Sequence, residues 1–492
     1  MSNTSILMTP DKRYEEERQK REEVRACIGG KADVIALVDC LPKPQYQIYN
    51  LGGLQGHALE QARACNEANS ERAKAYWARG RFFNATARTF ESLGGMVWSK
   101  EPEPDLDPAI DYLEDDADGS GTGLREAAQE ITDNLIAYAR YGVLVDMPSN
   151  ESGLTVAEMR EPANAPKMIS YTADQIIYSR LKNNKLDEVR LLEVVQEKKN
   201  EFEWEEKQQV RRLVVGDDGV YVNELYDDKD QLIKSVTPTA NGSALDFIPF
   251  QFFGSDANTA QYSKVTMYDM ANANLGHFVL DCDNRDNLHY HGQGMTNIYT
   301  EMEGDELSEN NPNGISVKAS GRNVFRATDR VEILQIDATG AIPAEMLRDE
   351  QRLIMLGAQL VTETSANQTL GAKEIETNAN VSTLKRIVRN TTAGLKTCLE
   401  WCSMFLGSEQ ESSYVINTDF LTDTMTPEMI AKHIEIVQLG VLPKATLYET
   451  ARNVGFTTLE DDELKERAEQ DGAEMIGMTE AQAKAQIDNE AD

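Results

Sequence analysis

The feature that most restricts the fold of this chain is a change in the spacing of its apolar residues. Between residues 167 and 253, apolar and polar residues alternate, and the turns NNK (183–185) and GDDG (216–219) interrupt the alternation. In residues 124–140 and 374–406 the apolar residues instead recur every three or four positions. A period of two is typical of half-buried strands and a period near 3.6 of helices. We therefore predict an α+β fold whose middle is one antiparallel meander of six or seven strands.

Helices are expected on both sides of this meander. Residues 12–25 mix acids and bases and predict a helix with a solvated face. The stretch EPEPDLDP (101–108) predicts a linker, and apolar strands are expected at 142–148 and 414–420. The longest helix is expected to pack along a seam of seven residues, in which the two cysteines are core thiols and not metal ligands. The seam comprises Leu384, Val388, Thr391, Leu395, Cys398, Cys402 and Phe405.

A polar stretch, VTETSANQTLGAKE (361–374), separates two of the expected helices. Helix–helix connections in compact domains usually need only about 2–8 residues. Two interpretations stay open: a loop that projects from the body to perform a function, or an ordinary surface loop.

Length and charge exclude several classes of protein. A chain of 492 residues is too long for one small core, and 40% apolar with 27% charged residues is typical of soluble globular proteins. No apolar run approaches the roughly 18 residues of a membrane span, and the first residues lack the pattern of a signal peptide. We thus expect a protein of the cytosol, or of a particle assembled there. A net charge of −34 argues against tight binding of nucleic acid, but not against DNA passing by without sticking.

No known catalytic or metal-binding pattern is present. The loop DDADGSGTG (115–123) fails as a calcium loop because Arg125 occupies the position of the bidentate carboxylate, so a flexible loop is expected. His289 and His291 end a helix and are interpreted as solvated imidazoles. The carboxylates of residues 281, 283 and 286 are expected to spread around the same helix. Asp146 ends a buried strand, where capping of the next turn is a more common role than catalysis.

Four stretches resemble bacteriophage portal proteins, and among these a phage family without an assigned role. They are NLIAYARYGVLVDMP (134–148), KMISYTADQIIYSRL (167–181), LDFIPFQFFG (245–254) and MYDMANANLGHFVLDCDNRDNLHYHG (267–292). The order of the expected elements resembles the same family over roughly residues 10–475. The resemblance implies a portal-type subunit with a wing of helices and antiparallel sheet, a two-helix stem, a small clip, a tunnel loop, a long helix and a helical crown.

The resemblance also implies boundaries for these parts. They are an N-terminal charged helix (1–25), the wing (26–263), stem helix one (264–291), the clip (292–341), stem helix two (342–361), the tunnel loop (362–373), the long wing helix and strand (374–425), the crown (426–475) and an acidic tail (476–492).

In function, the resemblance implies a dodecameric ring at one capsid vertex of the virion, through which double-stranded DNA enters and leaves. The expected partners are the terminase large subunit, a head–tail adaptor, the major capsid protein and a scaffold protein; no membrane, cofactor or catalytic role is expected. The tunnel loop would place polar side chains against DNA: Thr362, Ser365, Asn367, Gln368, Thr369 and Lys373. The clip would meet the adaptor and terminase through four acids: Glu303, Asp305, Glu306 and Glu309.

Two other classes remain as alternatives. One is another structural component of a phage head or tail, such as an adaptor, and the other is an enzyme whose site has no recognisable pattern. The insertion between the two stem helices favours a portal over an adaptor. A ring with an axial hole in an electron micrograph would separate a portal from a compact enzyme.

Overall fold

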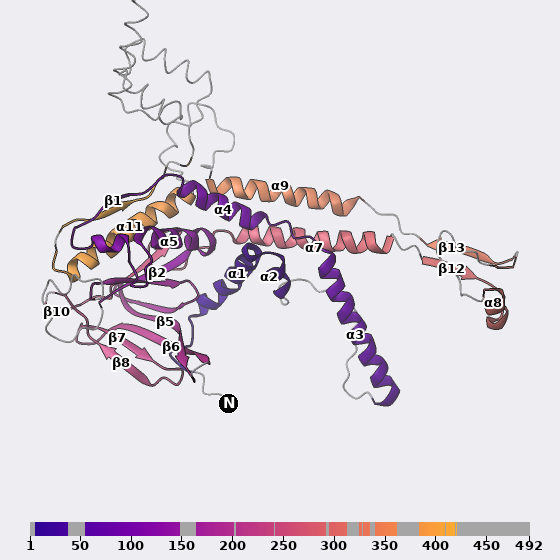
Figure 1. Cartoon of the computed structure of the whole chain (residues 1–492), viewed down its shortest axis with the longest axis horizontal. Coiled ribbons are helices and arrows are strands. Elements are labelled where there is room, and N and C mark those ends of the chain that lie inside the picture. The colour runs from indigo at the N-terminus through magenta and orange to yellow at the C-terminus, as the bar shows by residue number, and fades with distance from the viewer. Residues whose placement is uncertain are drawn as a thin grey trace, which may run out of the picture. The chain divides into compact units, whose positions relative to one another are not determined.

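The computed structural model describes most of the first 420 residues (Figure 1). The described residues are 5–37, 55–147, 164–200, 203–240, 242–291, 295–311, 324–326, 328–334, 340–361, 383–408, 410–418 and 420. The chain divides into two compact units, Met1–Asn417 and Thr418–Asp492. All of the elements below belong to the first unit.

Helices of the N-terminal part pack together around α1 (Lys12–Gly29). Its neighbours include α2 (Lys31–Ala36), α4 (Ala85–Val97) and α5 (Leu124–Tyr138). The charged helix α1 has the predicted exposed face, and its other face is buried: Tyr14, Val24 and Cys27 are buried and Arg21 is only 1% exposed. Arg21 is tolerated there because its Nε donates a hydrogen bond to Asp174 at 2.7 Å.

A three-stranded antiparallel sheet lies at the core, in the order β11–β2–β3. Its strands are β11 (Phe250–Gly254), β2 (Arg140–Asp146) and β3 (Lys167–Thr172). Every residue of β2 before Asp146 is buried. At Gly142 the Phe250 ring packs so closely that an added Cβ would lie 2.3 Å from its Cζ, so only glycine fits.

The strands that follow form a separate five-stranded sheet in the order β4–β5–β6–β7–β8. They are β4 (Ile176–Lys182), β5 (Lys185–Lys198), β6 (Trp204–Val215), β7 (Tyr221–Tyr226) and β8 (Leu232–Val236). The prediction of one single meander is therefore wrong in part. Five strands form a meander, but β3 and β11 pair with β2 instead. Because β2 is buried, the backbone groups on both of its edges need hydrogen-bond partners. A short hairpin of β9 (Thr239–Ala240) and β10 (Ser243–Ala244) follows.

The long helix α11 (Thr383–Phe405) packs on β11, β2 and α5. All seven residues of the predicted seam are buried, which confirms this packing surface. At Gly394 an added Cβ would lie 2.3 Å from Phe253 Cε1, so the helix approaches the sheet closely. After α11, β14 (Ser413–Val415) pairs with β1 (Glu103–Asp105), so the predicted linker contains a short strand, which the one-turn η1 (Asp111–Glu114) follows.

The cysteines divide sharply by exposure. Cys398 and Cys402 are buried free thiols, as predicted, and Cys27 and Cys282 are buried as well. Burial raises the pKa of Cys27, Cys282 and Cys402 to about 12. Cys65 is exposed, on α3 (Gly56–Arg79).

Candidate functional site

Two long helices, α7 (Tyr268–His291) and α9 (Ala341–Val361), lie side by side and pack against each other (Figure 1). Leu353 of α9 is buried, and Phe278 of α7 is buried against Trp77 and Phe82, at and after the end of α3. At Gly357 an added Cβ would lie 3.3 Å from Met270 Cε, so the helices approach closely. We call α7 and α9 the stem pair.

The outer face of α9 carries an apolar stripe. Leu347 is 56% exposed, Ile354 74% and Met355 55%. A spacing of seven or eight residues places these side chains on one helix face. Two ion pairs lie on the same helix, between Arg348 and Glu345 at 2.7 Å and between Arg352 and Asp349 at 3.1 Å, and Arg348 borders the stripe, seven residues before Met355. Large apolar groups aligned on an exposed face are typical of an interaction surface.

The three acids of α7, which were expected to spread around the helix, instead share one neighbour. All three contact the end of α3 and the residues after it, through Tyr76 Oη to Asp283 (2.6 Å), Arg79 Nη1 to Asp286 (2.5 Å) and Arg81 N to Asp281 (2.5 Å). The close approach is possible because Gly80 lies against α7, where an added Cβ would be 2.2 Å from Cys282 Sγ. These acids therefore fasten α3 to the stem pair.

A small module is inserted between the two stem helices. It contains the antiparallel ribbon of β12 (Met295–Tyr299) and β13 (Arg330–Leu334), and the short helix α8 (Gly304–Asn310). Asn311 ties the end of α8 to Val324, donating through Nδ2 at 3.0 Å and accepting at 2.9 Å. The acidic segment of this module is helical, and Asp305 and Glu306 in the first turn of α8 suit the positive end of the helix dipole.

The four predicted contact acids all lie on or next to α8. Glu303, Asp305 and Glu309 are exposed. Glu306 is half-buried, and its carboxylate pairs with the Arg326 guanidinium, whose Nε lies 3.0 Å from Oε1. The structure thus brings three exposed carboxylates together, two on α8 and that of Glu303 directly before it.

The predicted tunnel loop, 362–373, lies outside the described residues, together with its six candidate side chains: Thr362, Ser365, Asn367, Gln368, Thr369 and Lys373. The described helices on either side end at Val361 and begin at Thr383. The predicted crown and acidic tail also lie outside the described residues.

Asp146 has a structural partner. Its carboxylate lies 3.8 Å from Arg211, in a pocket of about 180 Å³ that Asn223 and Lys234 also line. Burial raises its pKa, while Arg211 and the Met147 N–H act in the opposite direction. Arg211 is held more closely by Glu193, at 2.6 Å. Asp146 therefore belongs to an ionic cluster that joins the two sheets. The turn that it was predicted to cap lies outside the described residues.

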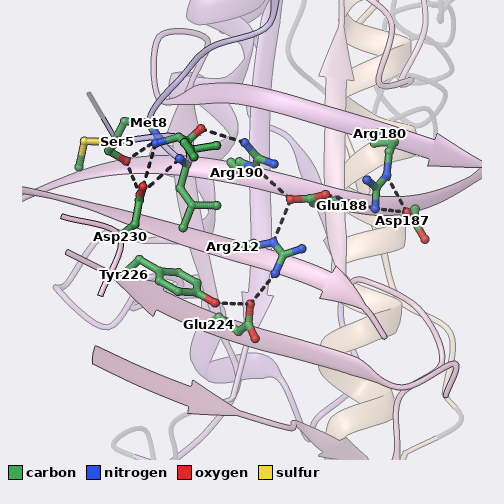
Figure 2. A network of polar contacts seen from close by, with 12 residues as sticks. Ser5, Met8, Arg180, Asp187, Glu188, Arg190, Arg212, Glu224, Tyr226 and Asp230 are labelled. Carbon is green, nitrogen blue, oxygen red and sulfur yellow. Dashed lines mark hydrogen bonds and ion pairs between the residues drawn. The ribbon is translucent and has the colours of Figure 1, made fainter. Parts of the chain in front are cut away.

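One charged network on the five-stranded sheet was not foreseen from the sequence (Figure 2). Glu188, only 1% exposed, accepts hydrogen bonds from Arg190 Nε and Arg212 Nε, both at 2.9 Å, and lies 3.2 Å from Arg180 Nη2. Burial acts to raise the pKa of Glu188, but the hydrogen bonds from Arg212 and Arg190 outweigh it and lower the pKa. These residues lie on three different strands. The alternation within one strand indicates which of its residues share a face of the sheet, but not which residues of the other strands lie beside them.

The loop 115–123 holds itself together through its own acids. Asp116 Oδ1 accepts the N–H groups of Gly119 at 2.7 Å and Gly121 at 3.0 Å. Although burial opposes the change, hydrogen bonds from Ser120 lower the pKa of Asp118 to about 2. Within the described ranges, no three His, Cys, Asp or Glu side chains are grouped as metal ligands would be. None of the helices described is both long and apolar enough to cross a bilayer.

Comparison with known proteins gives one family match and two similar structures. Residues 266–406 match a family described as a domain of unknown function (DUF4055). The structure is similar to the neck of a native GTA particle computed with C12 symmetry, at 10% identity and a TM-score of 0.36, covering 86% of this chain and 98% of the other. It is also similar to an HK97-family phage portal protein from Corynebacterium diphtheriae, at 9% identity and a TM-score of 0.30, covering 70% of this chain and 94% of the other. The phage portal proteins that the sequence resembles are thus among the structures matched. No curated protein matches.

Proposed function

We propose that this chain is the subunit of a phage portal: a dodecameric ring at one capsid vertex, through which double-stranded DNA is packaged and ejected. The sequence resemblance supports this role, and so does the insertion of a separate ribbon-and-helix module between two stem helices. Another head or tail component is the alternative, and an enzyme is a more distant one.

The apolar stripe on α9 carries the proposal of a ring. Leu347, Ile354 and Met355 are more than half exposed in the single chain, although each is large and apolar. A contact with the next copy would remove them from water. If the stripe contacts a different surface of the next copy, the association is head to tail, and it closes into a ring when the rotation allows it.

The charge of the chain suits a conduit. A protein that binds phosphates tightly would hold the duplex back, since each neutralised phosphate adds to affinity. With a net charge of −34 per subunit, the ring keeps DNA centred by repulsion. The polar segment 362–373 would then be the part that touches DNA, through neutral side chains and Lys373.

The module between the stem helices is proposed as the clip, which meets the terminase during packaging and the tail adaptor afterwards. Its exposed acids, Glu303, Asp305 and Glu309, call for a partner surface rich in Lys and Arg. Glu306 already has an internal partner in Arg326, so it would contribute less to that contact than the other three.

Electron microscopy of the purified full-length protein tests the proposal. We expect rings with an axial hole and, by mass photometry, a species many times the 54.9 kDa of one chain. Rings should become more abundant as salt rises, because salt screens the repulsion between acidic subunits. A discrete compact monomer or dimer at every salt concentration would refute the portal assignment and favour an enzyme.

A further inference from the structure

The segment Ser5–Thr9, which precedes α1, is folded against the five-stranded sheet, and we call it the strap. Its own groups close it into a turn. The Met8 N–H donates to Ser5 Oγ at 3.0 Å, and Thr9 Oγ1 donates to Ser5 O at 3.1 Å. The Thr9 N–H donates to Ile6 O at 3.3 Å. The strap is therefore a compact turn and not a further strand of the sheet.

One carboxylate holds the strap in place. Asp230, in the turn between β7 and β8, accepts the Ser5 hydroxyl, the Ile6 N–H at 2.8 Å and the Leu7 N–H at 3.3 Å (Figure 2). These donors, the Ser5 hydroxyl first, lower the pKa of Asp230, so the carboxylate is charged at neutral pH. The Asp230 N–H in turn donates to Asp227 O at 3.2 Å, which fixes the turn that carries the carboxylate.

A second side chain reaches the strap from the sheet. Arg190 of β5 donates through Nη1 to Ile6 O at 3.4 Å. Its Nε is bonded to Glu188 at 2.9 Å, and its guanidinium carbon lies 4.4 Å from the centre of the Tyr178 ring. The charged network of Figure 2 therefore positions Arg190 beside the strap. Within the part of the chain that the structure describes, Asp230 and Arg190 make all the hydrogen bonds between the strap and other elements.

Two apolar side chains of the strap cover part of the sheet. Leu7 and Met8 pack against a buried cluster of Tyr14, Ile177 and Val210. Val210 lies on β6, so the strap covers the sheet itself as well as the start of α1.

The covered residues belong to an apolar row that crosses the sheet. Leu192, Val210, Tyr226 and Leu232 are direct neighbours on β5, β6, β7 and β8, so their side chains share one face. At one end, Val210 is fully buried and Leu192 packs beside it. At the other end, Leu232 is 53% exposed. The strap therefore determines how much of this row is covered.

The strap is held more weakly than the sheet below it. Ile6 is 75% exposed, and Leu7 and Met8 are only partly buried. No backbone–backbone hydrogen bond joins the strap to the sheet among the described residues, whereas β5 and β6 share a ladder of eleven residue pairs. A segment with few buried apolar contacts and no ladder opens locally at a lower free energy than the core.

We propose that the strap is a releasable cover, which opens as a unit while the subunit stays folded. Opening exposes Val210 and Leu192, so that the row becomes one continuous apolar surface across four strands. Asp230 is the point of release, because all three of its hydrogen bonds weaken together when its charge is lost. This device does not depend on assembly into a ring.

Hydrogen–deuterium exchange of the full-length protein, followed by mass spectrometry of the peptide that contains the strap, tests the release. In the wild-type protein, the strap amides should be protected but should exchange at least tenfold faster than those of β5 and β6. Asp230→Asn should raise strap exchange about tenfold. Asparagine is chosen because residue 230 has a φ of 59°, a left-handed conformation that asparagine tolerates. Ser5→Ala should raise strap exchange severalfold. The matched control is Asp228→Asn, which removes the same charge from an exposed acid of the same turn.

A second measurement tests the cover. In Val210→Cys the added thiol lies under the strap, so a thiol reagent should modify it only when the strap opens. Adding Asp230→Asn should raise the rate of modification at position 210, read by peptide mass spectrometry, about tenfold. Adding Asp228→Asn should leave this rate within twofold.

Each outcome decides the proposal. Faster exchange in the strap alone, together with faster modification at position 210, supports it. Strap amides that exchange no faster than β5 and β6 in the wild-type protein would show that the strap opens only with the whole sheet, and unprotected strap amides would show that it is not docked; either result overturns the proposal. It is equally wrong if Asp230→Asn accelerates β5 and β6 as much as the strap, if modification at position 210 stays unchanged, or if Asp228→Asn acts as strongly.

Discussion

Replacing the three residues of the α9 stripe by serine should prevent ring assembly without unfolding the subunit. Fully burying a side chain such as Leu, Ile or Met contributes about 1.5–3 kcal/mol. Leu347, Ile354 and Met355 are 56%, 74% and 55% exposed, so a neighbour that covers them adds roughly 1–2 kcal/mol for each. The triple variant should lose roughly 3–5 kcal/mol per contact, which weakens each contact about a hundredfold to a few thousandfold.

Mass photometry over a range of protein concentrations measures this loss, and circular dichroism checks that the variant is folded. Arg348→Ser is the matched control, since it truncates a long, exposed side chain next to the stripe and should leave assembly unchanged. If the triple variant forms rings at the same concentration as the wild-type protein, the stripe is not the subunit contact. If the control prevents assembly equally, apolar burial is not what drives it.

Three further predictions concern other regions. Burial, with a smaller contribution from Glu130, raises the pKa of Asp133 from 3.8 to about 6. Between these two pH values the folded state binds a proton that the unfolded state has lost, so the stability of the fold decreases as the pH rises from 3.8 to 6. Asp133→Asn should therefore stabilise the protein at pH 8 by about 1 kcal/mol, after allowance for partial exposure, and should have little effect at pH 4. Urea denaturation at the two pH values measures this difference, and an equal gain in stability at both would contradict the prediction. Neutralising Glu303, Asp305 and Glu309 together should weaken the binding of the adaptor, and the loss of affinity should be larger at low salt. Neutralising Glu306 alone should change the affinity less. An unchanged affinity across these variants would exclude α8 as the contact. Replacing residues 364–372 by a short Gly-Ser connector should cost about 1 kcal/mol or less of stability and leave rings intact, but reduce the DNA protected inside capsids; normal DNA content would exclude a channel role.

The sequence was most informative where one helix buries one face. In α11, every residue of the predicted seam is buried, because the spacing alone determines which side chains share a face. The sequence was less informative about pairing between strands. Alternation predicts which residues form strands. It does not predict that β3 and β11 leave the meander to pair with β2, because the need of β2 for partners on both edges is not visible in the sequence of either strand.

Of the candidate site, sequence reasoning placed the four acids on one segment but not in a helix. The ion pair between Glu306 and Arg326 joins positions twenty residues apart, which no local pattern reveals. The same holds for Arg140, whose aromatic neighbours, Phe252 and Tyr262, are more than a hundred positions away in the sequence. The tunnel loop stays a prediction, since residues 362–373 lie outside the described residues.

The contrast between Cys65 and the buried thiols offers a way to attach a single fluorophore to each subunit. Thiol reagents attack the thiolate, so the buried cysteines with raised pKa values should react slowly with a maleimide dye, and Cys65 on α3 should react quickly. Replacing Cys40, which lies outside the described residues, would leave Cys65 as the main labelled position. Each assembled particle would then carry one dye per chain, and counting the photobleaching steps in one particle would give the number of its subunits directly.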